Sequence, residues 1–247
     1  MEMGRGYQGA VLNVLRAPEF ELDILDVAPA GDYTRVRVHN EDLLGHGRTR
    51  ELPPTVWVRL WIPEGDREHQ RGYTLVGMDH DAAEATIYLL HHEPAGPASR
   101  WALALTPGGT VSAQLYGGTR YCPPVAGTRL LLVGDPASVP AIADALAAAH
   151  SSCTAEVVVR APEDQWLPLG EVRGPVTRVH PDRGTDALVD VVSGLVATGA
   201  PDWAWVALES TPTRRVRRAL LDAGVPRGAI QHQAYWVQGR AMGRTDD

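Results

Sequence analysis

Two stretches, RGYT at residues 71–74 and HHEPAGPASRW at residues 91–101, decide how the chain is interpreted. The first offers a cation, an aromatic ring and a hydroxyl within four residues, and the second is a Gly/Pro loop leading into a run that can begin a helix. Free N–H groups at a helix start, with an arginine nearby, bind phosphate. The two stretches therefore predict a site for a nucleotide with a large, flat ring system, such as a flavin. The alternative is that Arg71 is a surface charge and Tyr73 an ordinary strand aromatic.

The composition sets limits on the class of protein. The 247 residues, 44% of them hydrophobic, are enough for one large or two small domains with a sizeable core. A net charge of −7 gives no reason to expect nucleic acid or an anionic membrane as a partner. The chain contains no lysine, which excludes Schiff-base chemistry. Cys122 and Cys153 form no zinc pattern, and residues 1–17 resemble neither a signal peptide nor a membrane span, so we expect a reduced, cytoplasmic setting.

Short alternating segments fill the first half of the chain. In residues 33–39, for example, apolar and polar side chains alternate as in a half-buried strand. Turn residues such as those at 29–32 separate the segments. Six or seven short strands with one short helix at 99–105 predict an antiparallel β-barrel over residues 1–124. The predicted strands are residues 11–15, 21–27, 33–39, 56–62, 73–78, 85–90 and 110–115, and the polar connectors are residues 39–50 and 67–70.

The pattern changes near residue 125. A continuous apolar run at 129–133 is typical of a buried parallel strand, and a helical run follows the turn at Gly134 and Asp135. Strands and helices then alternate, which predicts a doubly wound α/β domain over residues 125–247. The carboxyl ends of its strands are the expected ligand site. The predicted strands are residues 129–133, 156–160, 176–180, 203–208 and 234–237, the helices are 139–150, 186–197 and 213–223, and the strand-end loops are 134–138, 161–163 and 209–211.

Five motifs along the chain point to one family. A barrel followed by a parallel α/β domain is the arrangement of ferredoxin-reductase-like flavoproteins. The motifs are Arg71 to Thr74, His92 to Trp101, Gly134 to Ile142, Trp205 to Glu209 and Tyr235 to Gly239. In this order and over most of the chain, they resemble the siderophore-interacting protein family, bacterial flavin-containing reductases of ferric siderophores. No single motif would be specific, but together they are specific for the fold.

The resemblance implies that the barrel binds FAD. By match, Arg71 would contact the pyrophosphate, Tyr73 would lie against the isoalloxazine ring and Thr74 would hydrogen-bond its edge. The turn after residue 133 would receive NAD(P)H, and the reaction would be hydride transfer to the flavin followed by one-electron reduction of siderophore-bound ferric iron. Because the flavin supplies this chemistry, no catalytic side chain and no metal ligand is assigned. The implied cofactor contacts are Arg71, Tyr73, Thr74, His92, Gly96, Ala98, Ser99, Trp101, Gly134, Asp135 and Trp236.

The chain also departs from the family pattern near ligand positions. Val76 stands where a second arginine is usual, Pro136-Ala137-Ser138 replace a turn that often carries an acid and a threonine, and Leu208 stands where a glycine is usual. A second hypothesis is therefore a reassigned flavoprotein-like scaffold in natural-product biosynthesis. Such a protein would be a non-redox cyclase or other enzyme shaping a small organic substrate, with FAD structural or absent. A third is a non-catalytic binding module.

Other polar clusters have simpler explanations. Adjacent residues of a strand point to opposite faces, so His91 and His92 do not share a metal easily. The sequence at 79–81 is a polar turn between two strands. No serine lies in a Gly-x-Ser-x-Gly frame, which disfavours a hydrolase. The four arginines within 214–218 form either a solvated helix face or a surface for an acidic redox carrier protein.

Overall fold

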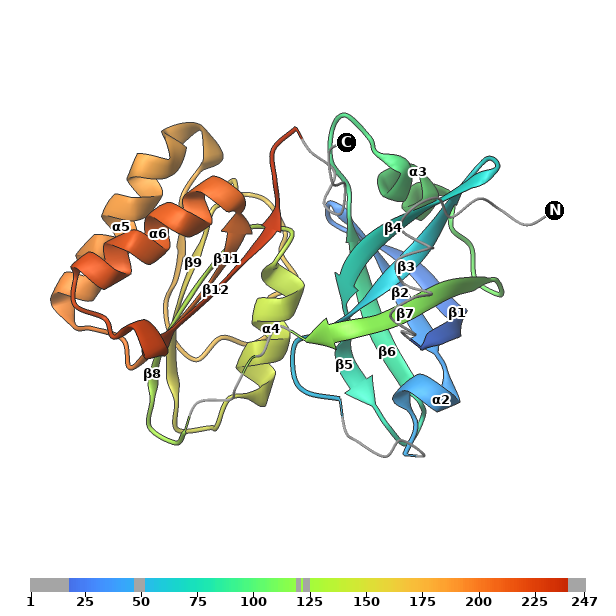
Figure 1. Cartoon of the computed structure of the whole chain (residues 1–247), viewed down its shortest axis with the longest axis horizontal. Coiled ribbons are helices and arrows are strands. Elements are labelled where there is room, and N and C mark those ends of the chain that lie inside the picture. Colours follow the sequence, from blue (N-terminus) through green and yellow to red (C-terminus); the bar gives the residue numbers. More distant parts are fainter. Residues whose placement is uncertain (1–17, 47–51, 119–120, 122–124, 240–247) are drawn as a thin grey trace. The chain divides into compact units, whose positions relative to one another are not determined.

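The structure, a computed structural model, describes residues 18–46, 52–118, 121 and 125–239. The described residues before Tyr121 form one compact unit, and those from Tyr121 onward form a second (Figure 1). The predicted boundary between residues 124 and 125 stays a prediction, because residues 122–124 lie outside the described residues. The strand predicted at residues 11–15 lies outside them as well.

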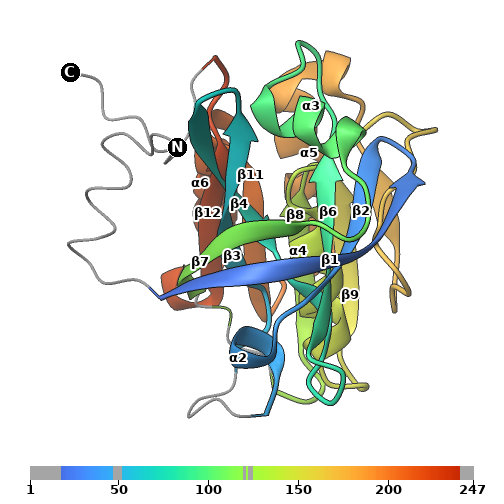
Figure 2. The ribbon, with the colours of Figure 1, turned by 90° about the vertical axis from the view of Figure 1, so that its right-hand side faces the viewer.

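Unit 1 is a seven-stranded antiparallel sheet with the strand order β4-β3-β7-β1-β2-β6-β5. Its strands are β1 (Glu19–Ala30), β2 (Tyr33–His39), β3 (Val56–Glu64), β4 (Arg67–Thr74), β5 (Val76–Asp79), β6 (Glu84–Leu90) and β7 (Thr110–Gly118). The two edge strands, β4 and β5, are joined by Leu75 alone, whose N–H donates to the carbonyl of Val56 at 3.0 Å. The sheet must therefore curve until its edges meet at this residue, which makes it a barrel (Figure 2).

Alternation along the strands fills the barrel with apolar side chains. On β3, Val58, Leu60 and Ile62 are buried in the core, as every second residue of a half-buried strand should be. Two short helices, α2 (Glu41–Leu44) and α3 (Pro97–Ala104), lie at opposite ends of the barrel (Figures 1 and 2). Helix α3 packs beside β3 and β4, and its Arg100 bonds to Glu64 at the hairpin end of these strands.

Three details of unit 1 differ from the sequence prediction. The single strand predicted at 73–78 is wrong, because the chain breaks at Leu75 between β4 and β5, which are opposite edges of the sheet. Residues 67–70 are not a connector: they are the first half of β4, where Gln70 pairs with Trp61 across the hairpin. Their polar side chains hide the strand, and Gln70 is nevertheless buried because its amide bonds to Arg59 and Gln114. The connector predicted at 39–50 contains α2, which is capped by the Asn40 side chain accepting from the N–H of Leu43 at 2.8 Å.

Unit 2 is a five-stranded parallel sheet with the order β10-β9-β8-β11-β12. Its elements are β8 (Arg129–Gly134), α4 (Val139–Ala148), β9 (Thr154–Val159), β10 (Val176–Arg178), η1 (Pro181–Arg183), α5 (Gly184–Thr198), β11 (Trp203–Glu209), α6 (Ser210–Asp222), η2 (Arg227–Ala229) and β12 (Ile230–Trp236). Helix α4 packs on one face of the sheet and α5 and α6 on the other (Figure 1). The predicted doubly wound domain and the antiparallel barrel before it are confirmed.

The three central parallel strands, β9, β8 and β11, are largely buried on both faces, which explains their apolar runs. In β8, Leu130 and Leu132 pack towards α4, whereas Leu131 and Val133 pack towards α5 and α6. Leu208, which stands where a glycine is usual in the family, is fully buried among the residues that pack towards α5 and α6. Among the described residues, no helix is long and apolar enough to cross a membrane.

Candidate functional site

The motif at residues 71–74 lies on β4, an edge strand of the barrel. Arg71 pairs with Leu60 and Tyr73 with Val58, so both side chains leave the same face of the strand. Thr74 leaves the opposite face and is buried. A ligand that contacts all three residues must therefore lie along the edge of β4, where the backbone is also accessible.

The charge states of this motif suit an anionic ligand. The Arg71 guanidinium donates from Nη1 to the carbonyl of Gln70 at 2.8 Å, and it forms no ion pair with any residue that the structure describes. Burial raises the pKa of Tyr73 to about 12, with the Arg71 charge acting in the opposite direction. The phenol therefore stays neutral at physiological pH, while Arg71 keeps a charge that no carboxylate neutralises.

The start of α3 has the features of a phosphate site. Gly96 stands at the N-cap and provides no side-chain cap, so the first N–H groups of the helix lack a side-chain acceptor. The hydroxyl of Ser99, in the same first turn, is buried and has no hydrogen-bond partner within the described parts of the chain. Buried hydroxyls without partners are rare in folded proteins because they cost free energy. Ligand oxygens at this helix start would satisfy both groups.

Several contacts hold the loop before α3 in place. A Cβ on Gly96 would lie 3.3 Å from Cε1 of His92, so a larger residue would require the His92 ring to shift by a few tenths of an ångström. The other histidine, His91, turns inward and lies 2.8 Å from the hydroxyl of Thr34. Arg100 bonds to the carbonyl of Ala95 and to Glu64, linking α3 to the β3–β4 hairpin. The two adjacent histidines thus point apart, as predicted.

Ala98 and Trp101, the remaining predicted cofactor contacts of unit 1, pack against the barrel core. Ala98 is buried in the barrel core, and Trp101 packs against that core from α3. Neither observation tests their predicted contact with a cofactor. Helix α3 packs on β3 and β4, so the unpaired Ser99 hydroxyl and the Arg71 strand lie in the same part of unit 1. A nucleotide diphosphate needs hydrogen-bond donors and a cation. The described residues offer an unpaired hydroxyl, an uncapped helix start and an arginine without a counter-ion among them, so they fit FAD.

A second cluster joins three strand ends of unit 2. In this strand order the connections reverse direction between β8 and β11, where α/β domains bind ligands. Asp135 follows β8, and its Oδ2 atom accepts from the N–H of Glu209 at 3.1 Å and from Nε1 of Trp236 at 2.8 Å. Its Oδ1 atom accepts from the N–H of Ala137 at 3.0 Å. One carboxylate therefore fixes the ends of β8, β11 and β12.

Asp135 is buried, and this changes its protonation. Burial raises the pKa of its carboxyl to about 6, although the hydrogen bonds from Trp236, Glu209 and Ala137 act in the opposite direction. Trp236 remains 37% exposed while its indole N–H is held by Asp135. The indole ring is thus fixed at the strand ends with part of its surface open to solvent.

The turn before α4 uses its own donors. The N–H groups of Ser138 and Val139 both donate to the carbonyl of Asp135, and that of Ala137 donates to the Asp135 side chain. Proline at positions 136 and 140 has no N–H to offer. The predicted contact of Gly134 and Asp135 with NAD(P)H stays a prediction, and an anionic nucleotide at this turn would need donors from elsewhere.

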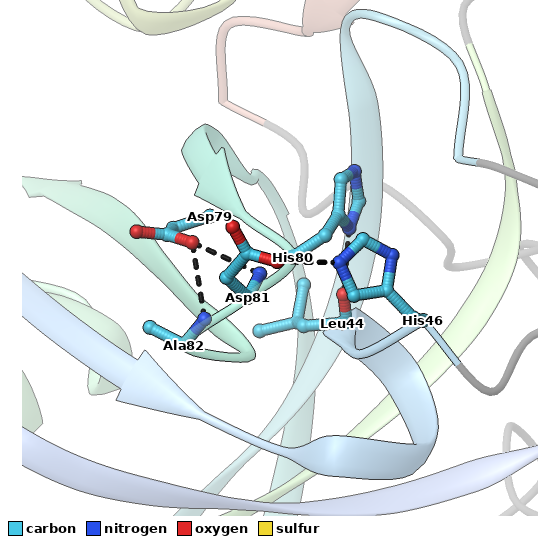
Figure 3. Close-up of polar contacts among 6 residues, drawn as sticks. All are labelled: Leu44, His46, Asp79, His80, Asp81 and Ala82. Atoms are coloured by element: carbon cyan, nitrogen blue, oxygen red, sulfur yellow. Dashed lines mark hydrogen bonds and ion pairs between the residues drawn. The ribbon is translucent and has the colours of Figure 1, made fainter.

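The polar turn at 79–81 and three of the four arginines of α6 form ordinary hydrogen bonds and ion pairs. In the turn at 79–82, the Asp79 carboxylate accepts from the N–H groups of Asp81 and Ala82, both at 3.0 Å (Figure 3). Nε2 of His46 lies 2.8 Å from Oδ1 of Asp81. Among the described residues, no group of three His, Cys, Asp or Glu side chains can hold a metal ion. On α6, Arg215 and Arg218 form ion pairs with acidic neighbours, as on a solvated helix face.

An antiparallel barrel followed by a five-stranded parallel α/β unit is the ferredoxin-reductase-like fold. Crystal structures agree: SipS from Aeromonas hydrophila has 18% identity and a TM-score of 0.75, covering 91% of this chain and 94% of that one. The siderophore utilization protein from T. fusca has 25% identity and a TM-score of 0.70, with 91% and 94% covered. Sequence-family models match as well, the siderophore-interacting FAD-binding domain at residues 30–115 and the siderophore-interacting protein at residues 128–239. The chain belongs to the siderophore-interacting protein family.

Curated relatives are longer than this chain. The mycobactin import ATP-binding/permease protein IrtA of Mycolicibacterium thermoresistibile is 33% identical over 258 residues. The match covers 98% of this chain but 27% of that protein. The corresponding protein of Mycolicibacterium smegmatis is also 33% identical, with 99% and 29% covered. The chain therefore spans less than a third of the curated relatives that it matches.

Sequence reasoning found the two motifs of unit 1 but missed the network in unit 2. The contacts of Asp135 with Glu209 and Trp236 join residues far apart in the chain. The sequence alone does not give the strand order. Its one signal that Asp135, Glu209 and Trp236 meet is that each stands at the end of a predicted strand or directly after one. Arg160, which follows β9, was also missed, although it occupies the same edge of the sheet.

Proposed function

We propose that the chain is an FAD-dependent reductase of ferric siderophores, which takes electrons from NAD(P)H or from a redox carrier protein. The observation that carries the proposal is the unpaired, buried hydroxyl of Ser99 at the uncapped start of α3, in the unit whose β4 carries Arg71. The family-model match of this unit to a siderophore-interacting FAD-binding domain supports the same cofactor.

Each residue of the barrel site has a distinct part in this proposal. Arg71 and the first N–H groups of α3 would hold the diphosphate of FAD, and the Ser99 hydroxyl would donate to one of its oxygens. Tyr73, neutral at physiological pH, would provide a flat face for the ring system. FAD, when bound, supplies the conversion between a two-electron donor and a one-electron acceptor. The protein's own residues bind and orient it.

The substrate is proposed from the family and from the relatives. Two family models describe siderophore-interacting domains, and curated relatives are named as mycobactin import proteins. Reduction of the bound iron would weaken the chelate, because ferrous iron is the less strongly charged cation. These comparisons favour the reductase over the hypothesis of a non-redox scaffold in natural-product biosynthesis. The cytoplasmic setting and the carrier protein stay predictions.

The barrel site can be tested by FAD titration of the purified protein. We expect Arg71→Ala to weaken FAD binding by about 10- to 100-fold, the range for one charge-assisted bond of about 1.5–3 kcal/mol. Arg67→Ala is the matched control, because Arg67 lies exposed on the same strand, four residues earlier. FAD affinity that is equal in the two variants would remove Arg71 from the site. A protein with no affinity for FAD would refute the proposed function.

A further inference from the structure

One side of helix α6 in unit 2 carries two arginines that point away from the neighbouring helix. The apolar side of α6 packs into the core of the unit. Arg215 points towards α5, where it forms an ion pair with Asp186. Arg214 and Arg217 are three residues apart, so they share the side of the helix away from α5. Because α6 packs against β12 as well as α5, this side adjoins β12, the edge strand of the sheet.

Neither of these two arginines has a carboxylate partner among the described residues. Arg214 donates to the hydroxyls of Ser210 at 2.9 Å and of Thr211 at 3.3 Å, which are both uncharged acceptors. Arg217 is half-buried, and it forms neither a hydrogen bond nor an ion pair with a residue that the structure describes. A guanidinium that loses part of its hydration without gaining a counter-ion raises the free energy of the protein. A carboxylate supplied by a binding partner would offset this cost.

A histidine on β12 extends the cationic side of α6. His232 is exposed, and partial desolvation and, second, the positive charge of Arg217 lower its pKa below the usual value. The effect of this charge places the two side chains close together. Arg214, Arg217 and His232 therefore form one surface, which we call the α6–β12 face. Residues 210–239 contain five arginines and one aspartate, a net charge of +4 in a chain whose net charge is −7.

The α6–β12 face leads to the exposed tryptophan of unit 2. Arg214 bonds to the first two residues of α6, which directly follow Glu209 at the end of β11. Glu209 pairs with Trp236, which ends β12 and is 37% exposed. Trp236 is also the residue at this end of β12 that the family resemblance predicts to contact FAD. A partner bound to the α6–β12 face would therefore lie next to a predicted cofactor contact.

We propose that the α6–β12 face binds an acidic redox carrier protein that supplies electrons to the reductase. This inference rests on the proposed function and assigns a docking surface to one of its two proposed electron donors. Carboxylates of the carrier pair with Arg214 and Arg217, so the charge that is unpaired in the free protein is neutralised in the complex. Two one-electron carriers, each oxidised in turn, supply the two electrons that fully reduce one FAD, and the protons come from water.

Isothermal titration with an oxidised, acidic [2Fe–2S] ferredoxin tests the α6–β12 face without FAD, siderophore or turnover. We expect the ferredoxin to bind at low ionic strength and to bind about tenfold more weakly in about 0.2 M salt, because salt screens exposed charges. Arg217→Glu should weaken binding by about tenfold at low ionic strength, because it places a negative charge opposite the carboxylates of the ferredoxin. Arg214→Glu, at the exposed end of the face, should act in the same direction and serves as a second variant.

Arg215→Glu is the matched control, because it changes the charge of the same helix equally but on the side that faces α5. It should change the affinity for ferredoxin by less than about threefold, since a charge outside the interface acts only at long range. Equal losses in Arg217→Glu and Arg215→Glu, or no binding of ferredoxin at low ionic strength, would overturn the inference. Binding to vesicles of phosphatidylserine and phosphatidylcholine in place of ferredoxin would overturn it as well.

The electron transfer is measured separately by mixing reduced ferredoxin with the FAD-loaded protein. Below saturation, the rate of FAD reduction should fall in Arg217→Glu by about the same factor as the affinity. An unchanged rate would overturn the role of the face in electron supply. Reduction of a ferric siderophore by protein whose FAD was reduced with light requires no carrier, so the proposed function can fail or succeed independently of this result.

Discussion

Replacing Ser99 by alanine should change stability and FAD affinity in opposite senses. The Ser99 hydroxyl is 1% exposed and has no hydrogen-bond partner among the described residues. A buried polar group without a partner costs about 1–3 kcal/mol. Ser99→Ala removes that cost from the FAD-free protein, so we expect its free energy of unfolding to rise by about 1 kcal/mol. For a protein of this size the midpoint of thermal unfolding should increase by about 2–4 °C.

The same substitution should weaken the complex with FAD. A hydroxyl bonded to a phosphate oxygen contributes about 1.5–3 kcal/mol, so its loss should raise the dissociation constant by about 10- to 100-fold. Circular dichroism of the FAD-free protein gives the first quantity, and quenching of FAD fluorescence gives the second. A variant with lower stability and unchanged FAD affinity would refute the reasoning, because it would show that the hydroxyl is satisfied within the protein.

Ser138→Ala provides the contrast. The Ser138 hydroxyl is also buried, but it accepts from the N–H of Asp135 at 3.0 Å and donates to the carbonyl of the same residue at 3.1 Å. Its removal leaves the N–H of Asp135 without this acceptor, whereas the carbonyl keeps the N–H groups of Ser138 and Val139. Stability should therefore fall by about 1–3 kcal/mol, the cost of one unpaired buried group. FAD affinity should not change, because the FAD-binding domain match ends at residue 115.

Two further predictions concern unit 2. Gly134→Ala should destabilise the protein by about 1–3 kcal/mol in urea unfolding, because a Cβ would lie 2.4 Å from Cδ1 of Ile142. Gly194 lies on α5 with open space around it, so Gly194→Ala should instead stabilise the protein by about 0.5–1 kcal/mol. Equal effects of the two substitutions would contradict the close packing at Gly134. Burial raises the pKa of Asp135 from 3.8 to about 6, so its contribution to stability is present below pH 4 and is lost as the pH rises through 6, by about 3 kcal/mol. Asp135→Asn should lack this slope, and an identical pH dependence in both proteins would show that Asp135 does not titrate there.

Much of the fold follows from local pattern. Strand β2 occupies the predicted residues, because alternation is clear where one face is buried and the other is polar. In unit 2, apolar runs predicted the central strands β8 and β11. Strand β12 begins at Ile230, four residues before the predicted 234–237, because residues 231–233 are polar. The first half of β4 was wrongly predicted as a connector, because residues 67–70 carry polar side chains and only pairing with β3 makes them a strand.

The candidate site in the barrel could be predicted where its residues are close together in the sequence, but the network in unit 2 could not. Arg71 and Ser99 are predicted contacts of the cofactor because an arginine and a small residue at a helix start suit a phosphate, and their contact with FAD stays a prediction. The network of Asp135 with Glu209 and Trp236 depends on the strand order, which no single segment encodes.

Production of ferrous iron per bound FAD tests the central claim most directly. The FAD-loaded protein would be photoreduced under anaerobic conditions with a sacrificial electron donor and then separated from that donor. It would next be mixed in the dark with a ferric siderophore and a chelator specific for ferrous iron. Because FAD carries two electrons and each ferric ion accepts one, the account predicts about two ferrous ions per FAD, formed faster than with the same amount of free FAD. No ferrous iron beyond that released by free FAD would contradict the account, whichever electron donor the protein uses.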